Sequence, residues 1–569
     1  MSFTPSIPET LKKIFHGNRF VIPPYQRKYS WRDEERKDLW DDIVEDLDLN
    51  HFIGTLCFMK DEDAGDIEND VYQIIDGQQR VTTLFILVNC LIEKLGDNKK
   101  KQQYSRMFIG TKEIPKLIPQ GEDSTFITNL IFDFEAIDPN AIEIRSQRHL
   151  YNAKRQFKSK VLNKSQVEVE NLLEYISKQI NVLIFEVVDY SQAVKMFTVI
   201  NDRGLQLNNL DKTKSTLMFY STLYLESSLN ADINEVFGRV FDNLDNILLK
   251  KEELKILNTI DDWDFENTFY THHYYSSRRL YDNWDYQLGA NTIFKRIKGA
   301  CENKKENESD LKLFVSEYIK DFDEFAQAYS DLFNTVKTET KYQQYFQYLQ
   351  FTATLFPLLV RLYQQKKLVN LFDILETAEV RVYKLKGNNP RANMYRFSSA
   401  ICEEDWTVEE IHDFIANFCE NFLNNYQLEA NLLNPVDKKQ GLVKYILHEY
   451  NKKVGGVTFS LKDYYDLQVE HIFSRGIESG IRKYGFGRQE TYDLEIPRIG
   501  NLTILESKLN NNANNLHPAD KEEYYLKSGL DMNHHMAGLL NEWNRELLNE
   551  RNGDLTQFVQ ERFLTFEDE

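Results

Sequence analysis

Apolar residues in the first 230 positions fall into short runs that predict strands alternating with helices. The runs 52–59, 71–75 and 181–188 predict strands, and the last is apolar enough to be buried. The longer run 81–95 predicts a helix that starts soon after the second strand, and another helix is predicted at 193–200. This alternation is typical of a mixed α+β domain.

The middle of the chain, from about 231 to 435, shows the spacing of amphipathic helices. Helical stripes cover residues 233–249, 311–336, 342–365, 368–385 and 408–423. Pro357 must bend its helix or begin a new one. The tandem pair His272-His273 has no third ligand nearby, so a packed or solvated segment is a better interpretation than a metal site. We interpret this region as a coupling element, with DNA contact as a further hypothesis.

The chain after residue 436 predicts a strand, a long loop, a second strand and a helix. The first strand ends at Glu470-His471, the second begins at Asn501, and the polar segment 509–512 follows.

Charge limits the functions that this chain can perform. The 569 residues are enough for several domains, and 69 Lys and Arg against 89 Asp and Glu give a net charge of −20. Such a surface repels DNA over most of its area. Any contact with nucleic acid therefore needs a local basic patch or a metal ion.

The remaining composition predicts a cytoplasmic protein without a membrane partner. None of the five cysteines lies in a Cys-x-x-Cys pair, so we expect neither a disulfide framework nor a thiolate zinc site. The first residues lack a basic segment followed by an apolar run, which argues against a signal peptide. The most apolar window, 346–362, is too short and too polar to span a bilayer.

Asp76-Gly77-Gln78-Gln79-Arg80 lies where the second predicted strand meets its helix. Backbone N–H groups and the dipole of a helix N-terminus attract anions, and Gly77 allows a close approach of the backbone. Arg80 can add a bidentate phosphate contact, and Asp76 can hold a magnesium ion that bridges phosphates. The chain has no P-loop motif. Taken alone, the pentapeptide favours a solvated turn.

A second candidate for phosphate binding lies between residues 201 and 214. Arg203 precedes Gly204, which is predicted to end a helix, and Lys214 lies in the first turns of the next one. Cationic side chains at helix ends suit a nucleotide. The alternative is a capping glycine with surface charges.

Glu470 and His471 offer the chemistry of phosphodiester hydrolysis. An imidazole of unperturbed pKa near 6.5 can take a proton from water at neutral pH. A divalent ion held by oxygen ligands can bind the scissile phosphate and the leaving oxygen. Neighbouring strand residues point to opposite faces, so we expect this pair at the strand's end, where a twist brings both to one site.

Three asparagines can complete that site. Asn501 begins the returning strand, and its side chain or backbone can orient His471. Asn510 is the predicted second ligand of the ion, and Asn514, one helical turn later, is the alternative. The Glu-His dipeptide alone favours a core or capping histidine, and the later asparagine blocks shift the interpretation toward a nuclease site.

Four separated blocks in the first 220 residues resemble the N-terminal domain of the GmrSD family of modification-dependent restriction enzymes. They are Pro24-Tyr25-Gln26-Arg27, Phe52-Ile53-Gly54-Thr55, the 76–80 block, and Asn201-x-Arg203-Gly204 with Asp211 and Lys214. The resemblance implies a ParB/sulfiredoxin-like fold that binds and hydrolyses a nucleoside triphosphate. It implies that Asp76, Gly77, Gln78, Gln79 and Arg80 form the nucleotide motif, with Tyr25, Gln26 and Arg27 lining the pocket.

Residues 460–530 resemble the C-terminal His-Asn-His (HNH) nuclease domain of the same family. The matching blocks are Glu470-His471-Ile472, Ile499-Gly500-Asn501-Leu502-Thr503 and Asn510. Ser474 stands where members often have a proline that has no chemical role. The resemblance implies that His471 and Asn501 are catalytic, and that Glu470 and Asn510 bind Mg²⁺, Mn²⁺ or another divalent ion.

Together these patterns predict a multidomain α+β protein. A ParB/sulfiredoxin-like domain spans 1–230, a helical coupling region spans 231–435, and a ββα-metal (HNH) nuclease domain spans 436–569. The expected function is antiviral defence, in which NTP binding or hydrolysis regulates metal-dependent cleavage or nicking of DNA, foreign or modified. An assembly of identical chains is compatible with the sequence. Two alternatives stay open: a nucleotide-gated DNA-binding regulator with a silent nuclease fold, and an RNA-directed HNH nuclease.

Overall fold

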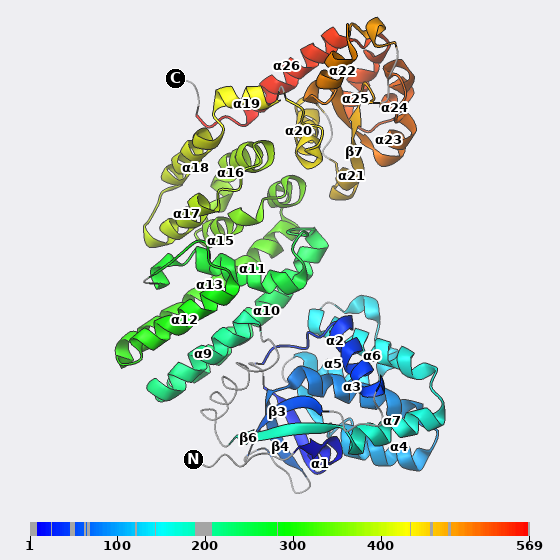
Figure 1. Ribbon diagram of the computed structural model, residues 1–569, viewed down its shortest axis with the longest axis vertical. Helices are drawn as coiled ribbons and strands as arrows, with labels where there is room; N and C mark the ends of the chain where they lie inside the picture. Colours follow the sequence, from blue (N-terminus) through cyan, green and yellow to red (C-terminus); the bar gives the residue numbers. More distant parts are fainter. Residues whose placement is uncertain are drawn as a thin grey trace.

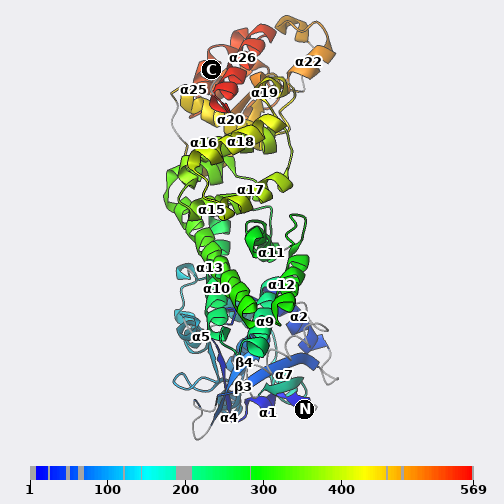
Figure 2. The same ribbon diagram turned by 90° about the vertical axis from the view of Figure 1, so that its left-hand side faces the viewer.

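The computed structural model is an elongated molecule with two separate sheets and many helices (Figures 1 and 2). It describes residues 8–23, 26–45, 52–61, 64, 69–119, 122–142, 144–187, 208–281, 283–432, 434–455, 459–475 and 480–566. The N-terminal domain lies at one end, helices fill the middle, and the C-terminal domain lies at the other end (Figure 1).

The N-terminal domain is built on a mixed six-stranded sheet in the order β1-β6-β3-β4-β2-β5. Its strands are β1 (Glu9–Thr10), β2 (Asn18–Ile22), β3 (Phe52–Lys60), β4 (Asp70–Asp76), β5 (Leu117–Pro119) and β6 (Asn181–Val187). β2 runs parallel to β4 and β5, and β3 runs parallel to β6 but antiparallel to β4. The three strands predicted from apolar runs are confirmed, but the third is not buried as expected, because only Val182 and Val187 of β6 are buried.

Helices pack around this sheet. They are α1 (Leu11–Phe15), α2 (Asp33–Glu45), α3 (Gln78–Lys94), α4 (Asn98–Tyr104), α5 (Glu122–Phe132), α6 (Arg145–Leu162) and α7 (Gln166–Lys178). The predicted helix after the second strand is α3, which is buried along most of its length because it packs against α6 and α7. The helix predicted at 193–200 lies outside the described residues.

The middle region is helical, as predicted. Its core begins ahead of residue 231, with α9 (Asn209–Tyr224). Its other main helices are α10 (Asn230–Leu254), α11 (Asp262–Tyr275), α12 (Ala290–Lys304), α13 (Glu308–Thr338), α15 (Phe356–Gln364), α16 (Phe372–Ala378), α17 (Arg391–Glu403), α18 (Val408–Phe422) and α19 (Asn425–Leu432). The helix predicted at 342–365 is broken, because Gln350 adopts a left-handed backbone (φ 62°). Pro357 lies in the first turn of α15, so it begins a new helix there.

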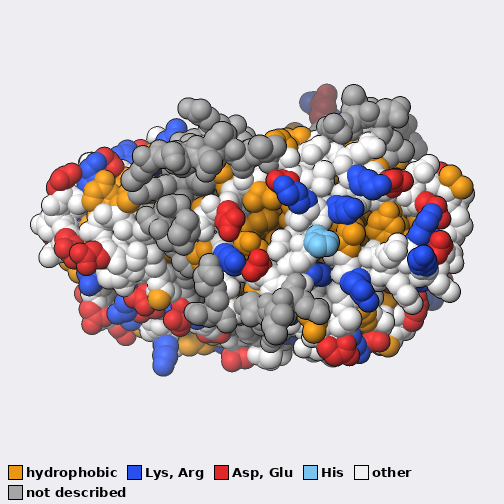
Figure 3. All heavy atoms as spheres, turned by 90° about the horizontal axis from the view of Figure 1, so that it is seen from below, with side chains coloured by type: hydrophobic (Ala, Val, Ile, Leu, Met, Phe, Trp, Pro, Cys, Tyr) orange, Lys and Arg blue, Asp and Glu red, His pale blue; other side chains and the backbone are white. Residues whose placement is uncertain are grey.

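The end of the molecule that carries the N-terminal domain shows mixed charges. Seen from below, basic and acidic side chains are interspersed there with apolar ones (Figure 3). The visible part of this end therefore offers no continuous single-sign surface.

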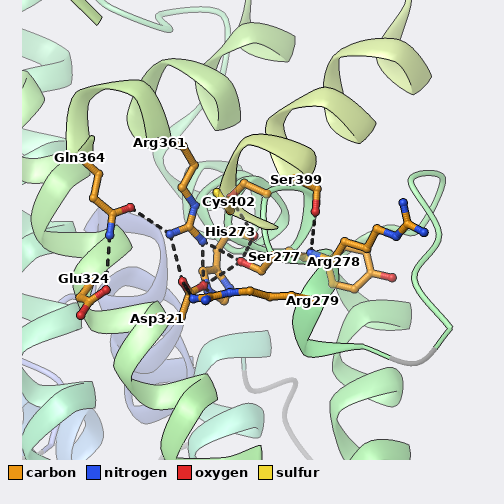
Figure 4. A network of polar contacts seen from close by, with 12 residues as sticks. His273, Ser277, Arg278, Arg279, Asp321, Glu324, Arg361, Gln364, Ser399 and Cys402 are labelled. Atoms are coloured by element: carbon orange, nitrogen blue, oxygen red, sulfur yellow. Dashed lines mark hydrogen bonds and ion pairs between the residues drawn. The ribbon is translucent and has the colours of Figure 1, made fainter. Parts of the chain in front are cut away.

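A buried carboxylate joins three helices of the middle region (Figure 4). Asp321 on α13 accepts hydrogen bonds from His273 Nε2 on α11 (2.9 Å) and from Arg361 Nη2 on α15 (2.7 Å). Ser277 Oγ (2.9 Å) and Arg279 Nη2 (2.8 Å), in the segment after α11, donate to the same carboxylate. The side chains of Asp321 and Arg361 are 2% and 3% exposed, so this is a core ion pair.

The tandem histidines are packed, which confirms one of the two structural alternatives to a metal site. His272 is buried and stacks on Tyr329 and Phe356, and burial lowers its pKa to about 3. His273 is also buried, and burial lowers its pKa, so both rings are neutral parts of the core rather than exposed ligands.

The C-terminal part has the predicted order of strand, loop, strand and helix. Its elements are α20 (Gln440–Lys453), α21 (Leu461–Asp466), β7 (Leu467–His471), α22 (Gln489–Glu495), β8 (Leu502–Glu506), α23 (Ser507–Ala513), α24 (Glu522–Leu526), α25 (Asp531–Ala537) and α26 (Arg545–Arg562). β7 and β8 form an antiparallel pair, with Glu470 opposite Thr503 and His471 opposite Leu502. The core of the middle region continues past residue 435 into these strands and α26.

Candidate functional site

The junction of β4 and α3 depends on two glycines. Gly77 has a φ of +89°, and a Cβ there would collide with the side chain of Leu56 on β3. Gly54 has a φ of +100°, and a Cβ there would lie 2.8 Å from Nη1 of Arg80. The guanidinium of Arg80 instead rests on β3 and donates to the carbonyl of Thr55 at 3.1 Å. The absence of a side chain at Gly54 and Gly77 thus leaves room for Arg80 beside the turn that follows Asp76.

Two acids and two cations lie together at this junction, partly buried, and we call this group of side chains the pocket at Asp76. Burial raises the pKa of Asp76, and the negative charge of Asp211 raises it further. Burial also lowers the pKa of Arg80, and it lowers that of Lys214 to about 7. Burial raises the pKa of Asp211, while Arg27 and Lys214 oppose that shift. The pocket therefore holds costly charges that a phosphate and a cation would stabilise.

Asp211 is the residue that sequence reasoning did not assign to this pocket. It lies in the first turn of α9, where Asn208 caps the helix by accepting from the backbone N–H of Asp211 at 2.8 Å. The signal was present in the sequence, because Asp211 precedes Lys214 by one helical turn.

The glutamines of the motif hold the preceding segment in place. Gln78 Nε2 donates to the carbonyl of Arg27 (2.8 Å), and Gln79 Nε2 donates to that of Lys28 (3.0 Å). Gln26 Nε2 donates to Ile75 O at 3.0 Å. The Oε1 atom of Gln78 is buried and has no hydrogen-bond partner among the described residues, so an additional donor or cation can still bind there.

Arg27 connects the pocket to the middle region. Its guanidinium pairs with Glu266 on α11, lies 3.9 Å from Asp211, and sits 6.0 Å from the ring centroid of Phe241 on α10. The side chains of Arg27 and Asp211 keep 23% and 24% of their surface exposed, so a ligand can reach both. Of the other predicted nucleotide contacts, Tyr25 and Arg203 lie outside the described residues.

At the other end of the molecule, the side chains of Glu470 and His471 have different partners. Lys521 is completely buried and donates to Glu470 Oε1 at 2.5 Å and to the backbone carbonyl of His471 at 2.6 Å. Burial raises the pKa of Glu470, and Lys521 opposes that shift. We expected a twist at the end of the strand to bring the two side chains to one site. They instead point to opposite faces of β7 and contact different residues.

The imidazole of His471 lies beside an aspartate that sequence reasoning missed. His471 Nε2 is 3.4 Å from Asp437 Oδ2, and Arg475 pairs with the same carboxylate. Burial and the charge of Lys521 lower the pKa of His471 to about 4, so the ring is neutral at pH 7. The side chain of His471 remains 21% exposed, whereas that of Asp437 is only 2% exposed. The arrangement is a solvent-accessible neutral imidazole with a buried carboxylate behind it.

Asn501 fixes the backbone that follows His471. Its Oδ1 accepts from the N–H of Phe473 (2.8 Å), and its Nδ2 donates to the carbonyls of Phe473 (3.0 Å) and Ile496 (2.9 Å). The backbone N–H of Ile472 donates to Asn501 O at 2.8 Å. Asn501 is completely buried, so its contribution is to position the segment.

The turn at Asn501 is clamped by α26. Gly500 lies so close to this helix that a Cβ would come within 2.6 Å of the carbonyl oxygen of Leu548. Arg551 on α26 donates to the carbonyls of Gly500 (2.6 Å) and Leu502 (2.7 Å). The start of β8 is therefore held from a helix that follows it in sequence by more than forty residues.

Asn510 lies on the same side of β7 as Glu470. Its Nδ2 donates to Oε1 of Gln468 at 2.8 Å, and Gln468 and Glu470 alternate onto one face of the strand. Asn510 Oδ1 is buried without a partner among the described residues. Asn514, the alternative ligand, lies at the C-terminal end of α23 with a φ of 22°.

Glu470 and Asn510 offer the types of oxygen ligand that suit a small divalent cation. A carboxylate and an unpartnered amide oxygen are the ligands that such ions prefer. Lys521 already places one positive charge on Glu470, so an added cation must share or replace that contact. In the described part of the chain, no group of three or more His, Cys, Asp or Glu could hold a metal ion by itself.

Both ends of the chain match models of one protein family, and this family places the chain in the class of restriction endonucleases. The chain belongs to the GmrSD restriction endonuclease family. The model of the GmrSD N-terminal domain matches residues 11–218, and the model of the GmrSD C-terminal domain matches residues 423–558. The resemblance drawn from the sequence motifs is confirmed at both ends. A search of curated proteins found no match. Within the described residues, no helix is long and apolar enough to cross a membrane.

Proposed function

We propose that this protein is a defence nuclease that hydrolyses DNA phosphodiesters at His471, under the control of a nucleoside triphosphate bound by its N-terminal domain. The observation that carries the proposal is the accessible, neutral His471 beside the buried carboxylate of Asp437, at the end of β7 in a GmrSD C-terminal domain. We further propose that the ββα unit is of the HNH type and that foreign or modified DNA is its target.

His471 is the general base in this proposal. Its Nε2 faces Asp437, which leaves Nδ1 for the attacking water, and the carboxylate stabilises the imidazolium that forms. A pKa of about 4 makes the free ring a weak base. A phosphate bound nearby adds negative charge, which raises that pKa toward neutrality and so improves proton abstraction.

Glu470 and Asn510 are the residues that would hold Mg²⁺ or a similar ion. A bound ion of this kind would neutralise the negative charge that develops on the phosphate and on the leaving oxygen. Because β7 ends at His471, a DNA strand that lies across its end can reach both faces of the strand. Asn501 acts by keeping the backbone after His471 in place.

The N-terminal pocket is proposed to bind the phosphates of the nucleotide. Arg80 and Lys214 provide cationic contacts, and Asp76 provides an oxygen ligand for the accompanying Mg²⁺. An anionic ligand stabilises the charged form of Lys214, so binding draws a proton to this side chain near pH 7.

Control over the nuclease is proposed to run through Arg27. This guanidinium contacts both the pocket and Glu266 of α11, and a phosphate competes with Glu266 for it. Nucleotide binding therefore changes the contact between the N-terminal domain and the middle region.

The proposal is tested by plasmid cleavage with Mg²⁺ or with EDTA, on wild type and His471→Ala. We expect the variant to lose nicking and cutting while its NTP hydrolysis stays at the wild-type rate. His517→Ala is the matched control, because this histidine of the same domain contacts Tyr484 rather than Asp437. Full cleavage by His471→Ala at unchanged stability would remove the assigned base.

For the pocket, Asp76→Ala or Arg80→Ala is expected to impair NTP turnover, and unchanged turnover in both would relocate that site.

A second candidate function is a nucleotide-gated DNA-binding regulator with a silent nuclease fold. One observation favours it: Lys521 already neutralises Glu470, the carboxylate that an ion needs. A wild-type protein that binds DNA but never converts the plasmid with any divalent metal would support this alternative.

A further inference from the structure

Four exposed arginines gather where α11 and the segment after it meet α12 and α17. They are Arg278, Arg296, Arg391 and Arg396, and we call them the arginine surface. Among the described residues, none of these guanidinium groups has an ion-pair partner. In a chain of net charge −20, four such cations in one place need an explanation.

Contacts within the protein place these arginines together. The backbone N–H of Arg278 donates to Ser399 Oγ of α17 at 2.9 Å. The Arg396 guanidinium lies over the ring of Tyr286, 4.9 Å from its centroid. Arg391 lowers the pKa of Tyr275, which burial raises, and Arg296 likewise opposes the raised pKa of Tyr274.

Aromatic rings lie between the arginines. Tyr275 of α11 stacks on Tyr395 of α17 with ring centroids 4.0 Å apart, and Trp284 lies 6.2 Å from Tyr274. A guanidinium held over Tyr286 loses little conformational freedom when it binds, and its N–H fork remains available for a phosphate. Two acids lie near this cluster in the described part of the chain. The backbone N–H of Asp285 donates to Tyr274 Oη at 3.0 Å, and its carboxylate accepts from the backbone N–H of Gln287 at 3.0 Å. Glu403 accepts from Ser399 Oγ at 3.5 Å.

The surface rests on a rigid base. Arg279 reaches inward to Asp321, whereas the side chain of Arg278 points away from that network (Figure 4). Ser277 is bound to the same carboxylate, so the segment that carries Arg278 is anchored from beneath. Cationic groups on a fixed backbone match a regular array of charges better than mobile lysines do.

We propose that the arginine surface binds the phosphate backbone of duplex DNA. This inference rests on the proposed function, since it supplies the local positive patch that an acidic nuclease needs to hold its substrate. Arginine forms bidentate contacts with phosphate, and duplex DNA offers one negative charge per about 1.7 Å of its length. The surface lies between the two ends of the elongated molecule, so DNA bound here is held apart from the pocket at Asp76 (Figure 2).

The test measures binding of a fluorescent DNA duplex by full-length protein that carries His471→Ala, so that cleavage does not interfere. Arg391→Gln/Arg396→Gln removes two charges from the exposed side of α17. Lys312→Gln/Lys320→Gln, also exposed but on α13, is the control with the same change of net charge. Each phosphate contact releases about 0.9 counterions when DNA binds. Loss of two contacts should therefore reduce the slope of log Kd against log salt concentration by about 2, and should raise the Kd at 0.15 M salt roughly 30-fold. The control should match the parent.

An unchanged Kd in the arginine variant, or an equal loss in the lysine control, would overturn the inference. So would an effect confined to an RNA duplex, which is measured in parallel. The experiments distinguish failure of the proposed nuclease activity from failure of the proposed DNA-binding surface. Arginine-dependent DNA binding by a protein that never cleaves DNA refutes only the proposed activity, and cleavage by a protein whose binding ignores these arginines refutes only the surface.

Discussion

The middle region should be sensitive to a substitution at the buried carboxylate of Asp321. Replacing it with Asn keeps the shape of the side chain but leaves Arg361, which is 3% exposed, without a counter-charge. Burial alone would raise the pKa of Asp321, yet Arg361 and His273 hold it well below its usual range. The carboxylate is therefore stabilised in its charged form by the groups that it joins.

The expected loss follows from this burial. Removing one partner of a buried ion pair typically costs 3–5 kcal/mol. For a cooperative unit of 150–250 residues, each kcal/mol lowers Tm by about 2–4 °C, so Asp321→Asn should lower the Tm of the helical region by roughly 6–20 °C. Asp323, two positions later on α13, is the matched control. It pairs with Arg239 at the surface, where such pairs contribute only about 0.2–1 kcal/mol.

Differential scanning calorimetry of both variants decides the matter. The transition of Asp321→Asn should move well below that of Asp323→Asn. Two variants that melt within a degree of each other would show that Arg361 does not depend on this carboxylate. The pH dependence adds a second check: because the pKa of Asp321 is lowered on folding, its contribution is present above the unfolded value near 3.9 and is lost as the pH falls below it.

Three further predictions concern other parts of the molecule. Gly54→Ala should reduce the proposed NTP hydrolysis by about tenfold or more, because its Cβ displaces the guanidinium of Arg80 beside the pocket, whereas Gly289→Ala, with open space around it, should not. The pKa of His272 falls from 6.5 to about 3 on folding. Below pH 6.5 the unfolded chain therefore binds a proton that the folded ring does not, and the free energy of unfolding falls by roughly 1.4 kcal/mol per pH unit. His272→Phe should flatten this part of the stability profile in urea titrations, and an unchanged profile would refute the assignment. Lys521→Met should raise the pKa of His471, measured by NMR, while Lys521→Arg should keep it low; equal values in both would contradict the stated cause.

Much of the fold could be predicted from local pattern. The turn at Gly77 and the strand–loop–strand–helix order around His471 were correct, because apolar runs and a glycine at a strand–helix junction are short-range signals. The helix expected across 342–365 was wrong at Gln350, whose left-handed backbone has no signature in the apolar spacing.

The chemistry of the candidate sites was less accessible, since it depends on long-range contacts. Asp437 meets His471 from 34 positions upstream, and Lys521 meets Glu470 from 51 positions downstream. Hydrophobic periodicity carries no information about such pairs. Gln79 shows the same limit: its side chain could equally have contacted a ligand, and only the folded backbone shows that it holds Lys28 O.

The clamp between α26 and Gly500 has a consequence for how the protein is made. During translation, β7 and β8 leave the ribosome before α26 does. The turn at Asn501 therefore lacks the hydrogen bonds from Arg551 until that helix has emerged and docked. A nascent chain therefore carries His471 before the contacts that fix the backbone around it are complete.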